Sequence, residues 1–290
     1  MRVLLLGGQG QLSLELQQRL QGRVDLQVLG SAQLDLAQGT AIRPRVLELR
    51  PQLILNAAAH TAVDQAESEP ERAFAINATA PGLLAEAAAE LGAPLLHYST
   101  DYVFDGRKAT PYDEDDTPNP LNVYGRSKLA GEQAIAAVGG AHLILRTSWV
   151  YSRHGRNFLL TMQRLLQERD SLNMVSDQIG APTWAGSIAQ ASCQLIEHWQ
   201  QGRAGPWGTY HLTALGETSW FGFASAIAAQ LREAGKTVAH LNPIPSSAYP
   251  TPAQRPLNSR LDCTRLQRDW AIQLPQWQAA LQECLAEQRQ

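Results

Sequence analysis

Hydrophobic and polar residues follow two kinds of pattern in the first half of the chain. Apolar runs typical of buried strands occupy Val3–Leu6, Val24–Leu29, Gln52–Ala58, Pro94–Thr100, His142–Val150 and Leu172–Val175. Apolar residues recur at helical spacing between them, as at Leu12, Leu16 and Leu20, and within Thr40–Leu49, Pro70–Leu91, Tyr124–Val138 and Asn157–Glu168. This alternation predicts an α/β fold with a doubly wound parallel sheet, Rossmann-like, with helices on both faces.

The pattern becomes less regular beyond residue 150, and prolines are dense between Pro243 and Pro256. We therefore predict a dinucleotide-binding Rossmann domain at residues 1–150. Residues 151–290 are expected to form mainly a smaller substrate-binding domain, partly interleaved, with some segments returning to the first domain. Polar and glycine-rich segments follow the predicted strands: GGQGQ, NAAAHTAVD, STDYVFDG and RTSWVY. Ligands bind at this end of parallel sheets, so the site is expected there.

A glycine-rich turn joins the first strand to the first helical pattern. Gly7, Gly8 and Gly10 precede Gln11 and Leu12, and the backbone N–H groups of such a turn bind a pyrophosphate with help from the helix dipole. The pattern GxxGxL departs from GxGxxG, with the small Ser13 where the third glycine would stand. Taken alone, the motif leaves a plain strand–helix turn open as the alternative.

A second motif places Tyr124 and Lys128 four residues apart, on one face of a predicted helix. A neighbouring ammonium favours the phenolate, so we expect Lys128 to lower the pKa of Tyr124 toward a value useful for proton transfer. The hydroxyl of Thr100 can hold a substrate oxygen beside the phenol. The Tyr-x-x-x-Lys pattern is short and common, so a surface helix pair stays open as its alternative.

Composition excludes several classes of protein. The net charge of the 290 residues is −3, from 24 basic and 27 acidic residues, with no basic stripe that indicates nucleic-acid binding. The apolar runs are too short to span a bilayer, so no membrane association is expected. Three widely spaced cysteines, Cys193, Cys263 and Cys284, suit a reducing cytoplasm, and seven scattered histidines show no zinc-ligand spacing.

Several longer segments together carry a family resemblance. The chain resembles the dTDP-4-dehydrorhamnose reductases, which are extended short-chain dehydrogenase/reductases, nearly from end to end and in the family's order. The resemblance rests on GGQGQLSLEL, LNAAAHTAVDQAESEPERAFAIN, HYSTDYVFDG, PLNVYGRSKLAGE, RTSWVY, SDQIGAPT and AYPTPAQRPLNSRLD. It implies reduction of the 4-keto group of dTDP-4-dehydro-6-deoxy-L-mannose by NAD(P)H. The product, dTDP-L-rhamnose, is a donor for bacterial surface polysaccharide.

The resemblance also implies roles for individual residues. Tyr124 is the proton donor, Lys128 binds the nicotinamide ribose, and Thr100 holds the keto oxygen. The cofactor is expected to contact Gly7, Gly10, Gln11, Leu12, Asp35, Leu36, Ala59, His60, Thr61, Tyr98, Tyr124 and Lys128. The substrate is expected to contact Thr100, Asp101, Trp149, Asn157, Gln178 and Arg255.

Some of these roles have structural alternatives. Trp149 ends a strand and suits an ordinary core position, and Asp101 suits the cap of a turn. His60 suits a backbone contact. Arg255 suits either the substrate diphosphate, which a guanidinium matches in geometry, or an ion pair within the protein.

Two departures from the family pattern affect the cofactor and the assembly. The second strand ends at Gly30 and Ser31 without the carboxylate that favours NAD, so we expect NADPH, with NADH also usable; Arg43 and Arg45 are candidates to reach the 2′-phosphate.

Some family members form dimers bridged by magnesium through glutamates. Glu15 matches one ligand, but Gly186 replaces another, so we expect no metal site and a monomer rather than a metal-bridged homodimer. Glu283 or Glu287 would have to complete such a site.

Three other functions stay open at the level of sequence. They are epimerisation or dehydration of another nucleotide sugar, a non-catalytic regulatory NADP-binding subunit, and a redox-sensing regulator of transcription. The intact trio of Thr100, Tyr124 and Lys128 favours an enzyme.

Overall fold

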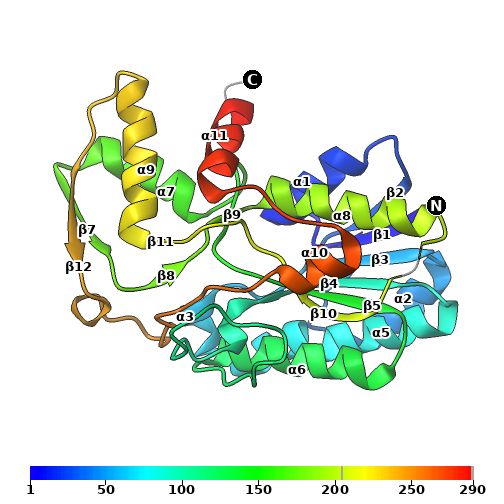
Figure 1. The fold of residues 1–290 in the computed structure, drawn as a ribbon. Helices are drawn as coiled ribbons and strands as arrows, with labels where there is room; N and C mark the ends of the chain where they lie inside the picture. Colours follow the sequence, from blue (N-terminus) through cyan, green and yellow to red (C-terminus); the bar gives the residue numbers. More distant parts are fainter. Residues whose placement is uncertain (204, 289–290) are drawn as a thin grey trace.

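A six-stranded parallel sheet forms the centre of the computed structural model, which describes residues 1–203 and 205–288 (Figure 1). Its strand order is β10-β5-β4-β3-β1-β2, and every neighbouring pair is parallel. The strands are β1 (Arg2–Leu6), β2 (Asp25–Leu29), β3 (Leu53–Asn56), β4 (Leu95–Thr100), β5 (His142–Thr147) and β10 (Gly208–His211). The chain reverses its direction of progress between β1 and β3, so a ligand-binding crevice is expected there.

Helices cover both faces of this sheet, as Figure 1 shows. One face carries α1 (Gln11–Leu20) and α8 (Ala185–Gln200), and the other carries α2 (Ile42–Leu49), α5 (Ala80–Leu91) and α6 (Val123–Val138). Val3 and Leu5 face the α1–α8 layer, whereas Leu4 and Leu6 face the opposite layer. Burial on both faces explains why β1 is a continuous apolar run.

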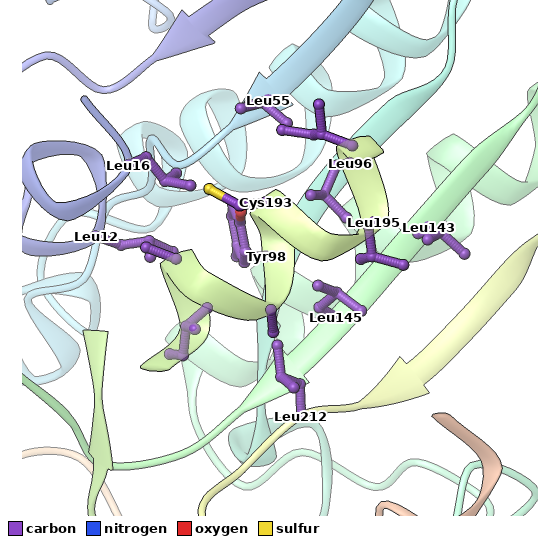
Figure 2. Close-up of a cluster of buried hydrophobic side chains, with 14 of the residues drawn as sticks. Leu12, Leu16, Leu55, Leu96, Tyr98, Leu143, Leu145, Cys193, Leu195 and Leu212 are labelled. Carbon is purple, nitrogen blue, oxygen red and sulfur yellow. The ribbon is translucent and has the colours of Figure 1, made fainter. Parts of the chain in front are cut away.

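Figure 2 shows part of the core on the α1–α8 side. Leu12 and Leu16 of α1 and Leu195 of α8 belong to one buried cluster with Leu96 and Leu145 of the sheet. Each fully buried leucine contributes about 1.5–3 kcal/mol through removal of its apolar surface from water. Helix α8, which lies far beyond residue 150, therefore packs in the same buried cluster as β1 and α1, the two elements that the glycine turn connects.

A second region lies beside the sheet. Strands β7 (Ser171–Val175) and β12 (His240–Ile244) pair in parallel. Helices α7 (Phe158–Glu168), α9 (Trp220–Glu233) and α11 (Trp277–Gln288) contribute to its own buried cluster. Two further short pairs, β6 (Val150–Tyr151) with β9 (Thr183–Trp184) and β8 (Ile179–Gly180) with β11 (Thr218–Ser219), connect its loops. The division of the chain at residue 150 stays a prediction.

The remaining elements are short. They are the 3₁₀ turns Gly39–Ala41, Asp101–Val103 and Ser246–Ala248, and the helices α3 (Val63–Ala66), α4 (Pro70–Phe74) and α10 (Thr264–Trp270). None of the described helices combines the length and apolar character that crossing a bilayer requires.

The sixth strand of the sheet differs from the sequence prediction. Leu172–Val175 does form a strand, but it belongs to the second region, and Gly208–His211 supplies the sixth strand instead. Tyr210 and His211 of β10 are buried, whereas β7 is half-exposed over most of its length. Short apolar runs of similar length do not reveal which sheet they will join, because non-local packing makes that choice.

Two predicted segments are interrupted. The run His142–Val150 breaks after Thr147 because Trp149 adopts a left-handed backbone with φ of 47°. The predicted helix Pro70–Leu91 contains a π-helical turn, Ala75–Thr79, between α4 and α5. Asn77 in this turn is buried, and its side-chain amide accepts from the backbone N–H of His60 at 2.8 Å. The π turn thus braces the loop after β3, as such turns often do beside functional sites.

Candidate active site

An open cavity of about 560 Å³ lies at the carboxyl ends of the central strands. The glycine-rich turn forms its floor at the N-terminus of α1. Gly7 has φ of 114°, and a Cβ there would lie 3.0 Å from the backbone of Ala57 and Ala58. Gly10 N–H donates to the carbonyl of Gly7 at 2.8 Å, which closes the turn. This geometry allows the backbone to approach a pyrophosphate closely at a positive helix end.

Most of the residues predicted to contact a dinucleotide line this cavity. They are Gly7, Gly10, Gln11, Leu12, Asp35, Leu36, Ala59, Thr61, Tyr98, Tyr124 and Lys128. His60 is the exception, because its backbone N–H and carbonyl are bonded to Asn77 and it does not line the cavity. The side chain of His60 does not make the alternative backbone contact, because its Nδ1 has no hydrogen-bond partner among the described residues, and its contact with the cofactor stays a prediction.

The cavity also has lining residues that the sequence did not indicate, among them Arg72 of α4 and Arg156 after β6. Both are exposed, and neither forms an ion pair among the described residues. Arg43 and Arg45, the candidates from the sequence, instead pair with Glu90 and Glu48 and do not line the cavity. The arginines that line the cavity therefore come from α4 and from the segment after β6, and not from the region of Arg43 and Arg45.

Helix α6 and strand β4 bring the proposed catalytic trio to the same end of the sheet. Asn122 caps α6 by accepting from the N–H of Gly125 at 2.8 Å, so Tyr124 lies in the first turn and Lys128 one turn later. Thr100 ends β4, where its hydroxyl accepts from the N–H of Tyr102 at 3.2 Å. Tyr124 and Lys128 both line the cavity with the glycine turn.

Burial controls the electrostatics of this pair. Burial raises the pKa of Tyr124 to about 12; the hydroxyl of Thr100 opposes this shift, and the charge of Asp101 adds to it. Burial also lowers the pKa of Lys128 to about 8, against the attraction of Glu132. The expectation of a lowered pKa for Tyr124 is therefore wrong for this arrangement, because burial of the phenol outweighs the hydrogen bond with Thr100 that favours the phenolate. A phenol with a raised pKa keeps the proton that a reduction requires.

A buried ion pair stabilises the helix that carries this pair. Glu132, one turn after Lys128, binds Arg146 of β5 through contacts of 2.6 and 3.0 Å. The hydroxyl of Ser99, a lining residue of the cavity, also donates to Glu132. Glu132 is therefore engaged by other groups and does not pair directly with Lys128. No local sequence signal distinguished Glu132 from a surface glutamate.

Trp149 and Gln178, which are predicted to contact the substrate, both contact Trp220. The rings of Trp149 and Trp220 stack with centroids 3.7 Å apart and an interplanar angle of 11°. The indole N–H of Trp220 donates to Gln178 Oε1 at 3.1 Å. Trp149 is half-buried and lies between Thr147 and Val150, which line the cavity. Trp149 packs on Trp220 beside the buried cluster of the second region, so its contact with the substrate stays a prediction.

Asp101 is almost entirely buried at the same end of the sheet. Its Oδ1 accepts from the hydroxyl of Thr100 at 3.1 Å, and its Oδ2 lacks a hydrogen-bond partner among the described residues. Burial raises the pKa of Asp101 to about 7, against the hydrogen bonds it accepts. Asp101 is thus bonded to Thr100 of the trio, and its contact with the substrate stays a prediction.

The side chain of Asn157 caps the helix α7. Its oxygen caps α7 by accepting from the N–H of Leu160, and its nitrogen donates to the carbonyls of Ser152 and His154 at 2.7 and 3.0 Å. Its donors and its acceptor are thus engaged with the backbone, as in a helix cap, and contact of Asn157 with the substrate stays a prediction.

Arg255 forms the ion pair that was its structural alternative. Its guanidinium contacts both oxygens of Asp64 at 3.1 and 2.8 Å, and it donates to the carbonyl of Ala253. The proline-rich loop is thereby fastened to α3. A substrate phosphate would have to compete with Asp64, so binding of a diphosphate by Arg255 stays a prediction.

The residues around Glu15 do not resemble a cation site. Glu15 is entirely buried, and Arg19 binds it at 2.6 Å. Arg153 lies 3.9 Å from Glu15 and 3.4 Å from Glu287. Within the described part of the chain, no group of three or more His, Cys, Asp or Glu side chains could hold a metal ion. The guanidinium groups of Arg19 and Arg153 thus lie at Glu15, where a divalent cation would have to bind.

The fold and the site together define the class of protein. A doubly wound parallel sheet, a glycine turn at a helix N-terminus and a Tyr-x-x-x-Lys pair in one cavity are the features of a dinucleotide-binding reductase of the short-chain type. Comparison with known proteins identifies the family. A family model described as the RmlD substrate binding domain matches residues 1–290.

The similar proteins of known name share one name. The chain is 46% identical to the dTDP-4-dehydrorhamnose reductase of Salmonella typhimurium, over 99% of this chain and 98% of that protein. It is 36% identical, with a TM-score of 0.91, to a dTDP-4-dehydrorhamnose reductase structure from Bacillus anthracis in complex with NADP, over 99% of both chains. A structure of a dTDP-4-dehydrorhamnose reductase from Clostridium acetobutylicum has a TM-score of 0.92 at 35% identity, over 100% of both chains. The chain belongs to the dTDP-4-dehydrorhamnose reductase family.

Proposed function

We propose that this chain reduces the 4-keto group of dTDP-4-dehydro-6-deoxy-L-mannose to give dTDP-L-rhamnose, with NADPH as hydride donor. One observation carries the proposal: Tyr124 and Lys128 line the same cavity as the glycine turn, in a member of this reductase family. A hydride donor on the turn and a proton donor on α6 are what reduction of a ketone requires.

Tyr124, Thr100 and Lys128 have separate roles in proton supply and charge stabilisation. When bound, the nicotinamide supplies the hydride. Tyr124 donates its phenolic proton to the oxygen that becomes the alcohol, and its raised pKa keeps it protonated at neutral pH. Thr100 holds the same oxygen in place. The ammonium of Lys128 binds the ribose hydroxyls and stabilises the negative charge that develops on the phenol.

The cofactor preference follows from the end of β2. Gly30 and Ser31 line the cavity and offer no carboxylate to repel a 2′-phosphate. Arg72 and Arg156 lie on the same cavity without an ion-pair partner among the described residues, and a guanidinium binds phosphate well. We therefore propose NADPH as the preferred cofactor, with NADH also used.

We also propose a monomer that works without a metal in the cytoplasm. Arg19 and Arg153 occupy the surroundings of Glu15, so a magnesium ion would meet two guanidinium groups there. The three cysteines are free, and two of them are buried, as expected for a chain that folds under reducing conditions.

One assay tests the proposed reaction. The 4-keto sugar nucleotide is generated in situ, and NADPH absorbance is followed after addition of the protein. We expect one NADPH consumed for each dTDP-L-rhamnose formed. An epimerase or dehydratase regenerates its cofactor, so conversion of the sugar without net NADPH loss would favour that alternative. Binding of NADPH without any turnover would favour a regulatory subunit or a redox sensor.

A further inference from the structure

Lys128 is held in the interior without a carboxylate partner. The residue is 1% exposed, and its Nζ lies 2.7 Å from the carbonyl oxygen of Tyr98 and 3.2 Å from His97 Nε2. Glu132, one turn further along α6, is bound to Arg146. Two uncharged groups therefore hold the amine, and its remaining hydrogen is free for the cavity that Lys128 lines. The buried ammonium therefore loses its proton more easily than an exposed lysine, because no counter-ion compensates the desolvated charge.

The ring of His97 connects this amine to the loop beneath the cofactor. His97 is entirely buried in β4, and its Nδ1 lies 2.9 Å from Nδ2 of Asn56 at the end of β3. Asn56 Oδ1 accepts from the N–H of Ala58 at 3.3 Å, and Ala58 lines the cavity. A continuous chain of hydrogen bonds thus runs from Ala58 through Asn56 and His97 to Lys128.

The donor and acceptor roles in this chain of hydrogen bonds depend on the charge of Lys128. Because Oδ1 of Asn56 accepts from the N–H of Ala58, Nδ2 faces His97 Nδ1 and donates to it, which puts the single hydrogen of a neutral imidazole on Nε2, facing Lys128. Only a neutral amine can accept this hydrogen bond. An ammonium has no lone pair, so it requires Nε2 as acceptor, the ring hydrogen on Nδ1, and the oxygen of Asn56 turned toward His97, which breaks the bond from the N–H of Ala58 to Asn56. The two charge states of Lys128 therefore need two opposite chains.

His97 itself stays uncharged in both arrangements. Burial, and then the charge of Lys128, hold the pKa of His97 well below its usual range. The other titratable groups of the same stretch of α6 are Tyr124 and Glu132, and Glu132 is bound to Arg146. Among the described residues, the amine has hydrogen-bond partners only in the carbonyl of Tyr98 and the ring of His97.

We propose that His97 is a positioning residue whose tautomer is coupled to the protonation state of Lys128, through a chain that Asn56 extends to the cofactor loop. Protons enter and leave by exchange with water, so no other reactant is needed. A cofactor whose ribose hydroxyls accept from Lys128 favours the ammonium and, with it, the Nδ1–H tautomer of His97. Only this consequence for catalysis rests on the proposed function; the coupling is a property of the protein alone.

The coupling is measured by ¹⁵N NMR of the histidine side chains in the full-length protein. The His97 signals are assigned by their loss in His97→Gln. We expect a neutral ring between pH 6 and about 10 that changes from the Nδ1–H to the Nε2–H tautomer near pH 8, where burial places the pKa of Lys128. Saturating NADP⁺ should move this change to higher pH. A single tautomer throughout, or a cationic ring at pH 6, would overturn the proposal.

Kinetics provide an independent test with variants that act in opposite directions. Asn56→Asp offers only acceptors, which forces the Nδ1–H tautomer and favours the ammonium, so the basic limb of the kcat/KM profile should rise by about one pH unit. His97→Leu removes a charge-assisted hydrogen bond from the ammonium and only a weaker neutral one from the free amine, so the limb should fall by a similar amount. If Asn56→Asp does not fold, the direction of the His97→Leu shift decides alone. A limb that does not move in a folded His97→Leu protein would contradict the proposal.

A matched control separates positioning from a structural effect. His211 is also entirely buried in the same sheet, but its Nδ1 contacts the carbonyl of Tyr112 at 3.1 Å, and its ring lies beside Phe104. His211→Gln should lower thermal stability without moving the basic limb. Because the NMR measurement needs no turnover, failure of the reductase assay and failure of the tautomer coupling are distinguishable.

Discussion

The Nζ of Lys128 lies 2.7 Å from the backbone carbonyl oxygen of Tyr98, so helix α6 and strand β4 are joined at the proposed catalytic amine. This contact directs one hydrogen of the amine into the protein and fixes the position of the nitrogen. Tyr124, one turn earlier on α6, is positioned by the same helix. The helical spacing places the two side chains on one face, and the contact with Tyr98 fixes where the amine lies against the sheet.

Replacement of Tyr124 by phenylalanine removes the proposed proton donor and keeps the ring. We expect kcat to fall by about 10²–10⁴, the usual contribution of a general acid, with NADPH affinity little changed. Steady-state kinetics and a cofactor-binding titration measure the two quantities. The control is Tyr112→Phe, whose hydroxyl donates to Asp105 and does not line the cavity. An unaltered kcat in Tyr124→Phe would remove this residue from the chemistry.

Replacement of Lys128 by methionine tests the role of the ammonium. Burial lowers the pKa of Lys128 to about 8, so the wild-type kcat/KM should be level at neutral pH and decline as pH rises through about 8. In Lys128→Met this decline should move to higher pH, because only the phenol of Tyr124 then titrates, and cofactor affinity should fall. A pH profile identical to wild type would contradict the electrostatic role.

Cofactor selectivity tests the interpretation of the end of β2. The wild type should favour NADPH or use both cofactors similarly in kcat/KM. Gly30→Asp should shift the preference toward NADH, because a carboxylate repels the 2′-phosphate and accepts from the ribose 2′-OH. A Cβ at Gly30 would lie 3.2 Å from Oε1 of Gln33, a flexible side chain, so the variant is expected to fold.

Two arginine variants provide a matched comparison for this prediction. Arg72→Gln should weaken NADPH more than NADH, whereas Arg43→Gln should affect neither, because Arg43 is paired with Glu90 away from the cavity. A strong wild-type preference for NADH would show that the missing carboxylate does not determine selectivity.

The buried carboxyl of Asp101 predicts a pH dependence of stability. Burial raises its pKa from 3.8 to about 7, so the folded protein keeps a proton that the unfolded chain has lost. The stabilisation from this proton is complete below about pH 4 and is lost as pH rises through about 7. Between these pH values, the wild type should lose about 2–4 kcal/mol relative to Asp101→Asn. Urea unfolding at a series of pH values measures the difference, and parallel curves would contradict the prediction.

Chelation tests the expected independence from metal. EDTA should leave both turnover and molecular mass unchanged, because Glu15 is bound by Arg19 and no metal-holding cluster is found among the described residues. Light scattering and the NADPH assay, each with and without chelator, measure the two properties. Loss of a dimer together with activity would show that carboxylates such as Glu283 or Glu287 complete a site.

The sequence by itself determined the features that depend on short-range spacing. Five of the six strands of the main sheet and the glycine turn follow from apolar periodicity and from backbone positions that exclude a Cβ, as at Gly7. Tyr124 and Lys128 face the same cavity because one helical turn separates them.

Only the tertiary structure decided which distant segments meet and how burial changes their chemistry. It brought Gly208–His211 into the main sheet, stacked Trp220 on Trp149, and paired Arg255 with Asp64. It also reversed the expected pKa shift of Tyr124, because desolvation depends on the surrounding protein and not on the four-residue spacing to Lys128. Neighbours along the chain specify local geometry, whereas the ionisation of a buried group depends on contacts that form only on folding.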